Sequence, residues 1–200
     1  MNPHFVFNAL TSIQHLITED KEEKAILYLN KFSKLLRGVL HNSRRSTTRF
    51  STELDLLENY LELEFLRLGD QYTYALIVDE SIQSDDIEIQ ALLFQPFIEN
   101  AIHHGLAHKK EGGHLKIEIR DKGDHLFCVI EDNGIGRERS AVINRGRKKD
   151  SVGMDLARER MAILTHQDVD DLIRIIDLFD GKEPAGTRVE LKIPMKMQVS

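Results

Sequence analysis

A chain of 200 residues is long enough for one large domain, or for one domain with a small helical module, and it can bury a core without disulfides or metals. Hydrophobic residues make up 41% and charged residues 30%, as in ordinary globular proteins, and the net charge of -6 argues against direct nucleic-acid binding. The single cysteine, Cys128, excludes an internal disulfide, and no apolar run reaches the length of a membrane span.

The first seventy residues show the spacing of three amphipathic helices. Two apolar stripes are expected to be buried: Val6, Leu10, Ile13 and Ile17 in the first helix, and Ile26, Leu29, Phe32, Leu36 and Leu40 in the second. The polar, basic run HNSRRSTTR predicts a loop before the third helix. That helix begins near Ser51 or Thr52, either of which could cap it, and Gly69 ends it.

The pattern changes after Gly69. YTYALIV, rich in aromatic and β-branched residues, predicts a strand. A helix is expected over residues 87–104, ended by Gly105. KIEIR and LFCVIED then predict two strands of a hairpin joined by the turn KGD.

The last third of the chain begins with the charged segment RERSAVINRGRKKD. A short helix over residues 154–164 and two strands, LIRIIDLF and TRVELKIP, follow it. Strands mixed with segregated helices indicate an α+β fold, in which helices pack over a mostly antiparallel sheet.

Three short motifs follow one another in the second half of the chain. FIENAIHHG lies on a predicted helix, EDNGIG ends a predicted strand, and SVGMDL begins a predicted helix. A Gly-Thr pair, Gly186 and Thr187, precedes the last strand.

These residue types suit nucleotide chemistry. Asp132 follows an apolar strand, so its carboxylate could accept a hydrogen bond from the exocyclic amine of adenine at the mouth of an apolar pocket. Gly134 and Gly136 would let the backbone approach a flat ligand. Asn100 offers an oxygen suited to Mg²⁺, and Gly153 opens a helix whose N–H groups could face phosphate. The charged segment could fold over a triphosphate as a lid.

Each motif alone has an ordinary structural explanation. DNGIG suits a turn, ENAIHHG suits a helix that ends at a glycine, and the basic segment suits a solvated loop. The order and spacing of all of them together are harder to obtain by chance.

This order resembles the ATP-binding domain that sensor histidine kinases share with type II topoisomerases, Hsp90 chaperones and mismatch-repair ATPases. ENAIHHG is similar to its N box, DNGIG to its first glycine box, SVGMDL to its second, and AGTRVELKIP to its closing strand. PHFVFNAL and ELDLLENYLELEFLRLGD resemble the phosphoacceptor motif and the following helix of sensor histidine kinases in the autolysin-regulator (LytS-like) group.

The resemblance implies a fold in two parts. Residues 1–70 would form a helical phosphoacceptor and dimerisation region, and residues 71–200 a two-layer α/β sandwich of the Bergerat type that binds ATP. Because Met1 stands only three residues before His4, we expect the helical region to be truncated at its N-terminus.

The resemblance also implies a role for each matching residue. His4 matches the phosphorylated histidine, Asn100 the Mg²⁺ ligand, Glu99 the acidic catalytic residue before it, and Asp132 the carboxylate that reads adenine. The remaining nucleotide-binding positions are His103, Gly134, Gly136, Gly153 and Thr187.

Three positions depart from the family's pattern. Ser151 stands where the second glycine box has its first glycine, and this restricts the backbone of the lid. His103 stands where a lysine is common, so its contact with phosphate depends on its protonation. Phe5 replaces the acidic residue that often follows the phosphoacceptor, so the base for His4 must come from elsewhere.

The expected activity is that of an ATP-dependent protein-histidine kinase. The γ-phosphoryl group of ATP would pass to an imidazole nitrogen of His4, and then to an aspartate of a response-regulator receiver domain, which could be of the LytTR type. Asn8 lies one helical turn after His4. Its amide could orient a water that removes phosphate from the partner, or it could simply hydrogen-bond locally.

Two alternatives belong to other classes of function. A degenerate kinase would bind nucleotide without transferring phosphate, and a chaperone- or topoisomerase-type ATPase would hydrolyse ATP in the same pocket. The helical front with PHFVFN argues against the second alternative. We also expect a homodimer, and a cytoplasmic location within a bacterial inner-membrane protein that contacts the membrane only through segments upstream.

Overall fold

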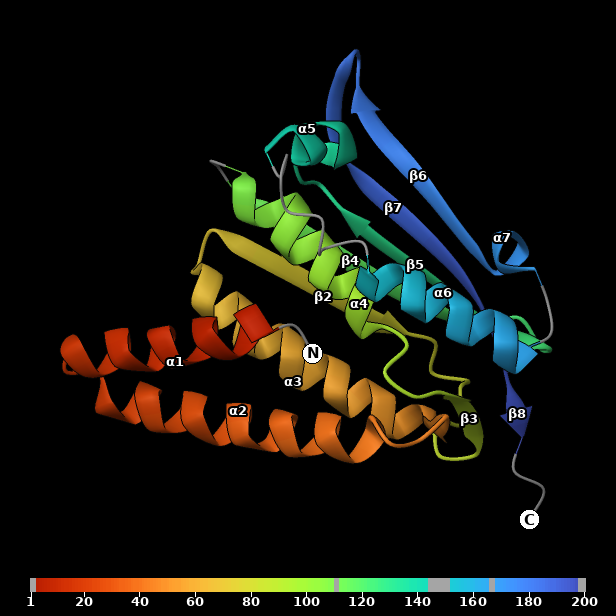
Figure 1. Cartoon of the computed structure of the whole chain (residues 1–200), viewed down its shortest axis with the longest axis horizontal. Helices are drawn as coiled ribbons and strands as arrows, with labels where there is room; N and C mark the ends of the chain where they lie inside the picture. Colours follow the sequence, from red (N-terminus) through yellow and green to blue (C-terminus); the bar gives the residue numbers. More distant parts are fainter. Residues whose placement is uncertain (1–2, 110–111, 144–151, 166–167, 198–200) are drawn as a thin grey trace.

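Three helices occupy the first third of the chain in the computed structural model, which describes residues 3–109, 112–143, 152–165 and 168–197. They are α1 (Pro3–Thr18), α2 (Glu22–Asn42) and α3 (Phe50–Leu68), and Figure 1 shows α3 lying between α2 and strand β2 (Tyr72–Val78). The expectation of a helical front is confirmed.

The buried faces of α1 and α2 differ from the predicted stripes. In α1 the buried residues are Phe5, Ala9 and Ile13, while Leu10 and Ile17 are 48% and 55% exposed. In α2 the buried face consists of Ala25, Tyr28, Phe32, Leu35, Val39 and Asn42, whereas Ile26, Leu29 and Leu40 are exposed. The prediction was right for Ile13 and Phe32 but wrong for the exposed positions, because each helix carries apolar residues on more than one face and spacing alone cannot choose between them.

Helix α3 begins one residue before the predicted cap. Arg49 is its N-cap, without a side-chain cap hydrogen bond, so the expectation of a cap at Ser51 or Thr52 is wrong. The reason is that Thr47–Arg49 forms strand β1 within the run expected to be a loop, and the Ser51 N–H is bonded to the Ser84 carbonyl at 3.0 Å. Gly69 ends the helix with φ of 89°, as expected.

A five-stranded sheet forms the body of the second half. Its strands are β2 (Tyr72–Val78), β4 (Gly113–Asp121), β5 (His125–Asp132), β7 (Glu183–Pro194) and β6 (Ile173–Asp180), in that spatial order. Only the β2–β4 pair is parallel, which confirms a mostly antiparallel sheet. Burial alternates along β4 and β5, because one face of the sheet meets the helices.

The predicted helix over residues 87–104 is wrong at its beginning. Ile87–Gln90 is strand β3, and the helical part is short: α4 (Gln95–Asn100), the π-helical turn η1 (Ala101–Gly105) and the 3₁₀ turn η2 (Leu106–His108). Strand β3 stands between β1 and β8 (Lys196–Met197) in a second, three-stranded sheet. This small sheet joins three segments that are remote from one another in the sequence.

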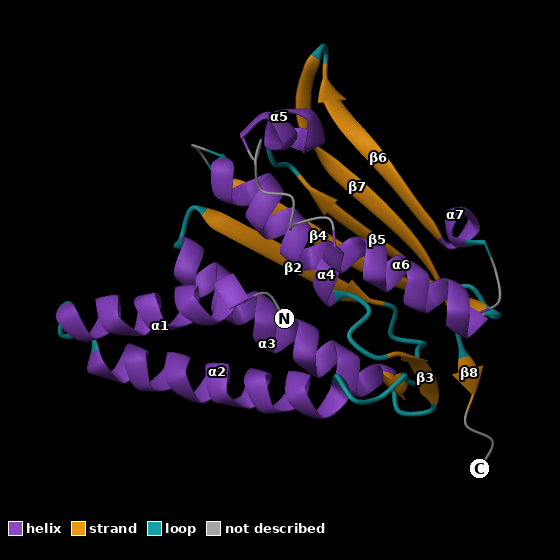
Figure 2. Ribbon diagram, viewed as in Figure 1, coloured by secondary structure: helices purple, strands orange, loops and turns teal. Residues whose placement is uncertain are grey.

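The remaining helices are α5 (Gly136–Ile143), α6 (Val152–Thr165) and α7 (Val169–Leu172). Figure 2 shows α4 and α6 lying across the five-stranded sheet as a separate layer. The two-layer α+β architecture expected for this region is therefore confirmed.

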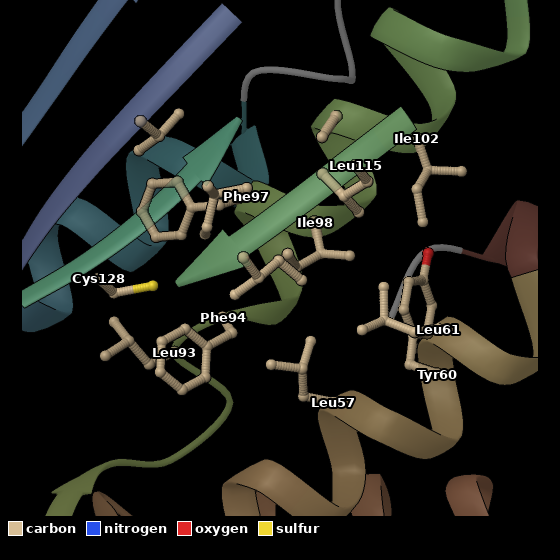
Figure 3. Packing of buried hydrophobic residues seen from close by; sticks show 14 of the residues in the cluster. Leu57, Tyr60, Leu61, Leu93, Phe94, Phe97, Ile98, Ile102, Leu115 and Cys128 are labelled. Carbon is tan, nitrogen blue, oxygen red and sulfur yellow. The ribbon is translucent and has the colours of Figure 1, made fainter. Parts of the chain in front are cut away.

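A single hydrophobic cluster runs from the helical front into the sheet. It contains Phe5 of α1 as well as Leu115 and Cys128 of the sheet strands. Figure 3 shows Leu57 and Leu61 of α3 on the side of the cluster where Phe94 and Ile98, at the start of and within α4, also lie. No helix in the described ranges combines the length and the apolar character needed to cross a membrane.

Candidate functional site

Asp132 ends β5 as a buried carboxylate. Its side chain is 3% exposed, and Oδ1 accepts the Gly134 N–H at 2.9 Å. Burial raises the pKa of Asp132 to about 6, although hydrogen bonds from the backbone of Gly134 and Thr187 oppose the shift. Burial therefore favours the protonated form of this carboxyl group, while the two backbone hydrogen bonds favour the ionised form.

The loop after Asp132 contacts the end of the N-box helix through backbone atoms. A Cβ on Gly134 would lie 2.3 Å from the carbonyl carbon of Gly105, and the Ile135 N–H is bonded to the Gly105 carbonyl at 3.2 Å. A Cβ on Gly105 would lie 2.6 Å from Asp132 Oδ1. Glycine at both positions is required by this packing, whereas the sequence suggested Gly134 for ligand approach and Gly105 only as a helix stop.

The Gly-Thr pair lies against the same loop from β7. Thr187 is 5% exposed and stands opposite Asp132 in the strand register. Gly186 has φ of 137°, and a Cβ there would lie 1.9 Å from the Asp132 carbonyl oxygen. Gly186 thus allows β7 to approach Asp132, a requirement visible only once the two strands are paired.

Glu99 and Asn100 occupy the end of α4, and both are half-buried. Glu99 Oε1 accepts a hydrogen bond from Gln95 Nε2 at 2.8 Å, which orients the carboxylate along the helix. Five residues after Asn100, Gly105 touches Asp132. The structure therefore brings the first two predicted motifs together.

The donor set suits a weakly held hard cation. Asn100 can offer an amide oxygen, and the described residues contain no cluster of three or more His, Cys, Asp or Glu that could hold a metal by themselves. Mg²⁺ in nucleotide sites is commonly bound by one or two protein oxygens together with phosphates and water. The residues present fit that arrangement.

His103 faces helix α3. Its Nε2 lies 3.5 Å from the hydroxyl of Tyr60, a buried residue whose ring also packs on Phe5 with centroids 5.2 Å apart. The beginning of α1 and the N-box turn thus approach one residue of α3. Tyr60 was missed in the sequence because its role depends on two contacts that are remote along the chain.

His4 is the second residue of α1, and Asn8 lies one turn later. Asn8 is half-buried, and its carbonyl accepts a hydrogen bond from Ser12 Oγ at 3.0 Å. Phe5, directly after His4, is 1% exposed. An aromatic residue at that position is therefore used for packing, and it anchors the beginning of α1 on α3.

The segment expected to form a lid begins as helix α5. Gly136 has φ of 76°, and a Cβ there would lie 2.7 Å from Pro184 Cβ. Arg137 and Arg139 are paired with Asp177 and Glu183 of the β6–β7 hairpin. The other basic residues of this segment and Ser151 lie outside the described residues, and Gly153 is the second residue of α6.

Two family descriptions match the chain. The sequence model described as "Histidine kinase" matches residues 1–72. The model described as "Histidine kinase-, DNA gyrase B-, and HSP90-like ATPase" matches residues 85–197, more than half of the chain. Both matches follow the order of elements described above.

Curated relatives resemble between two thirds and nearly all of the chain. A sensor protein LytS from Enterococcus faecalis is 31% identical over 99% of this chain and 33% of its own length. One from Oceanobacillus iheyensis is 35% identical over 74% of this chain and 25% of its own. The sensor histidine kinase BtsS of Escherichia coli is 32% identical over 66% of this chain and 23% of its own. The chain thus spans about a third or less of the length of these relatives.

Solved structures share the fold at low sequence identity. The mycobacterial sensor histidine kinase MprB matches with a TM-score of 0.50 at 13% identity, covering 76% of this chain and 98% of its own. The blue-light activated histidine kinase from Erythrobacter litoralis matches with a TM-score of 0.50 at 12% identity, covering 93% of this chain and 90% of its own.

Proposed function

Because this chain belongs to the sensor histidine kinases related to LytS and carries their ATPase domain, we propose that it is a kinase core that phosphorylates its own His4 from Mg-ATP. The observation that carries the proposal is the meeting of Asp132 with the N-box turn at Gly105. The "Histidine kinase" match over residues 1–72 favours a kinase over a chaperone- or topoisomerase-type ATPase.

The nucleotide would bind where the two motifs meet. Asp132 would accept a hydrogen bond from the adenine amine, and Thr187 would stand behind the base. The backbones of Gly134, Gly136 and Gly153 would border the nucleotide, and His103 would approach the phosphates. Asn100 would hold Mg²⁺, which neutralises charge on the phosphates when bound.

The proposed reaction is a phosphoryl transfer to imidazole. A ring nitrogen of His4 attacks the γ-phosphorus, the bond from that phosphorus to the β–γ bridging oxygen breaks, and ADP leaves. The attacking nitrogen carries no proton in the neutral ring, so the other ring nitrogen gives up its proton as the new bond forms. Glu99, which Gln95 orients at 2.8 Å, is the carboxylate that we assign to this proton.

The phosphoryl group would then pass to an aspartate of a response regulator, which we propose to be of the LytTR type. Asn8, one turn from His4, would orient a water that hydrolyses the phosphoaspartate of the response regulator and releases inorganic phosphate. The division of the chain at residues 70 and 71, and the attachment of the parent protein to a membrane, stay predictions.

A homodimer is supported by apolar side chains that the helical front leaves exposed. They lie on α1 and α2, outside the faces buried against α3: Phe7, Leu10, Ile17, Ile26, Leu27, Leu29 and Leu40. Exposed apolar groups gathered on two neighbouring helices are typical of a surface that another helix pair covers.

Labelling with γ-phosphate-labelled ATP and Mg²⁺ tests the proposal. We expect label that is lost in acid, survives alkali and disappears in His4→Gln, and Asp132→Asn should prevent labelling by weakening nucleotide binding. His15→Gln is the matched control, because His15 is an exposed histidine of the same helix. Label that persists in His4→Gln, or nucleotide binding by the wild type without any label, would overturn the kinase assignment; the second result would leave a nucleotide-binding module.

A further inference from the structure

Glu53 is a buried carboxylate that the reaction above does not use. It lies in the first turn of α3 and is 3% exposed. Its two oxygens accept backbone hydrogen bonds from residues far along the chain: Oε2 from the Leu92 N–H at 3.0 Å, and Oε1 from the Phe94 N–H at 3.3 Å. A side chain of the helical front therefore ends inside the turn that leads to the N box.

That turn has an unusual backbone. Leu92 has φ of 56°, in the left-handed region that a leucine rarely adopts. Phe94 is the N-cap residue of α4, so the turn sets where the helix begins and where Glu99 and Asn100 lie. The Ala91 N–H is bonded to the Ser46 carbonyl at 3.1 Å, which holds the other end of the turn against the α2–α3 connection.

The burial of Glu53 is unfavourable by itself. Desolvation raises its pKa to about 7, while the backbone hydrogen bonds and the charge of Arg160 in α6 act in the opposite direction. An apolar side chain could occupy this buried position at a lower cost in folding free energy. A strained leucine and a desolvated carboxylate that are held against each other indicate a requirement for this particular turn geometry.

We propose that Glu53 is a positioning residue of the nucleotide site: by holding the turn of residues 91–94, it fixes the start of α4 and thereby aims Asn100 at Mg-ATP. This inference rests on the proposed function. Asp132 lies on β5 and accepts backbone hydrogen bonds from Gly134 and Thr187, so its approach to adenine depends on Glu53 less directly than the position of Asn100 does.

The test distinguishes binding of the phosphates and Mg²⁺ from binding of the adenine base. Binding of Mg-ATP and of adenosine is measured by NMR titration on the whole chain. In Glu53→Gln an amide N–H would face a backbone N–H, so we expect the affinity for Mg-ATP to fall roughly tenfold or more, as for other residues that orient a metal ligand. The affinity for adenosine, which lacks the phosphates and needs no metal, should stay within about twofold of the wild type.

Two further variants complete the test. Glu58→Gln changes an exposed residue of the same helix and should leave both affinities unchanged. Glu53→Asp keeps the charge but is too short to reach both N–H groups, so its affinity for Mg-ATP should lie between those of the wild type and Glu53→Gln. If Glu53→Gln does not fold, Glu53→Asp alone decides the matter.

The outcomes distinguish the inference from the proposed function. A variant that binds both ligands as the wild type does, or one that loses both equally, would overturn a positioning role for Glu53. Hydrogen exchange at the Leu92 and Phe94 amides should also become faster in Glu53→Gln, and unchanged exchange would contradict the proposal. A wild-type chain that binds neither ligand would instead refute the nucleotide site itself.

Discussion

The buried carboxylates show how single residues connect the site to the stability of the protein. Asp132 and Glu53 are each 3% exposed, and both accept hydrogen bonds from backbone N–H groups. Burial raises both pKa values, to about 6 and about 7. A buried carboxylate lowers the stability of the folded state when it ionises. Such groups are therefore concentrated at sites where they bind a ligand or position the residues that do.

Asp132 should make stability depend on pH. Its pKa is about 6 in the folded chain, against 3.8 for an unperturbed aspartate, so the folded state binds the proton more tightly. The stabilisation from this group is complete below pH 3.8 and is lost as the pH rises through 6, a change of about 3 kcal/mol. The amide side chain introduced by Asp132→Asn does not titrate, so this variant should lack the pH-dependent contribution to stability.

Urea unfolding of the wild type and of Asp132→Asn between pH 4 and pH 7 measures the effect. The free energy of unfolding of the wild type, relative to that of the variant, should decrease as the pH rises. A difference that does not change with pH would show that the carboxyl group of Asp132 titrates normally.

At the scale of elements, helix α5 is tied to the β6–β7 hairpin. Arg137 Nε and Nη2 each contact a different oxygen of Asp177 at 2.6 Å, so the ion pair is bidentate. The two side chains are 46% and 32% exposed, so solvent screens the pair strongly. The geometry therefore orients α5 more than it stabilises the fold.

Asp177→Asn should lower the free energy of unfolding by only about 0.5–1 kcal/mol, as for other exposed ion pairs. Asp180→Asn, on the same strand and exposed, is the matched control. Thermal unfolding in low and high salt would show whether the difference between the variants disappears as salt increases. A loss several times larger than predicted, or one that salt does not reduce, would mean that α5 is anchored by more than this pair.

At the scale of the whole molecule, the helical front and the sheet share one core. Strand β1 pairs with β3, Glu53 holds the turn before α4, and Leu57 and Leu61 of α3 are buried. A division at residues 70 and 71 would cut all of these contacts. Each large apolar side chain removed from the core costs roughly 1.5–3 kcal/mol.

A fragment of residues 71–200 should therefore be less stable than a fragment of residues 44–200, which keeps β1 and α3. We expect its Tm to be lower by at least about 5 °C, because a few kcal/mol of packing are lost. Calorimetry of the two fragments under the same conditions tests this. Equal Tm values would show that the contacts of β1 and α3 contribute little to the stability of the sheet.

Much of the fold could be predicted because its signals are local. The β4–β5 hairpin follows from alternation around a tight turn, and α6 and the final strands appear where the periodicity places them. The motifs around Asn100, Asp132 and Thr187 were recognised by the order of their residues. The strand at residues 87–90 was missed because it is short, and because it pairs with segments about forty residues before it and over a hundred after it.

The amino-acid sequence by itself thus determined which residues carry polar chemistry and in what order, since composition, spacing and turn residues act over a few neighbours. Only the tertiary structure decided which faces of α1 and α2 are buried, why Gly105 and Gly186 must lack side chains, and that Glu53 reaches the turn before α4. The physical reason is that these features arise from contacts between backbones and buried groups remote along the chain, where the available space and hydrogen-bond partners depend on how the elements pack.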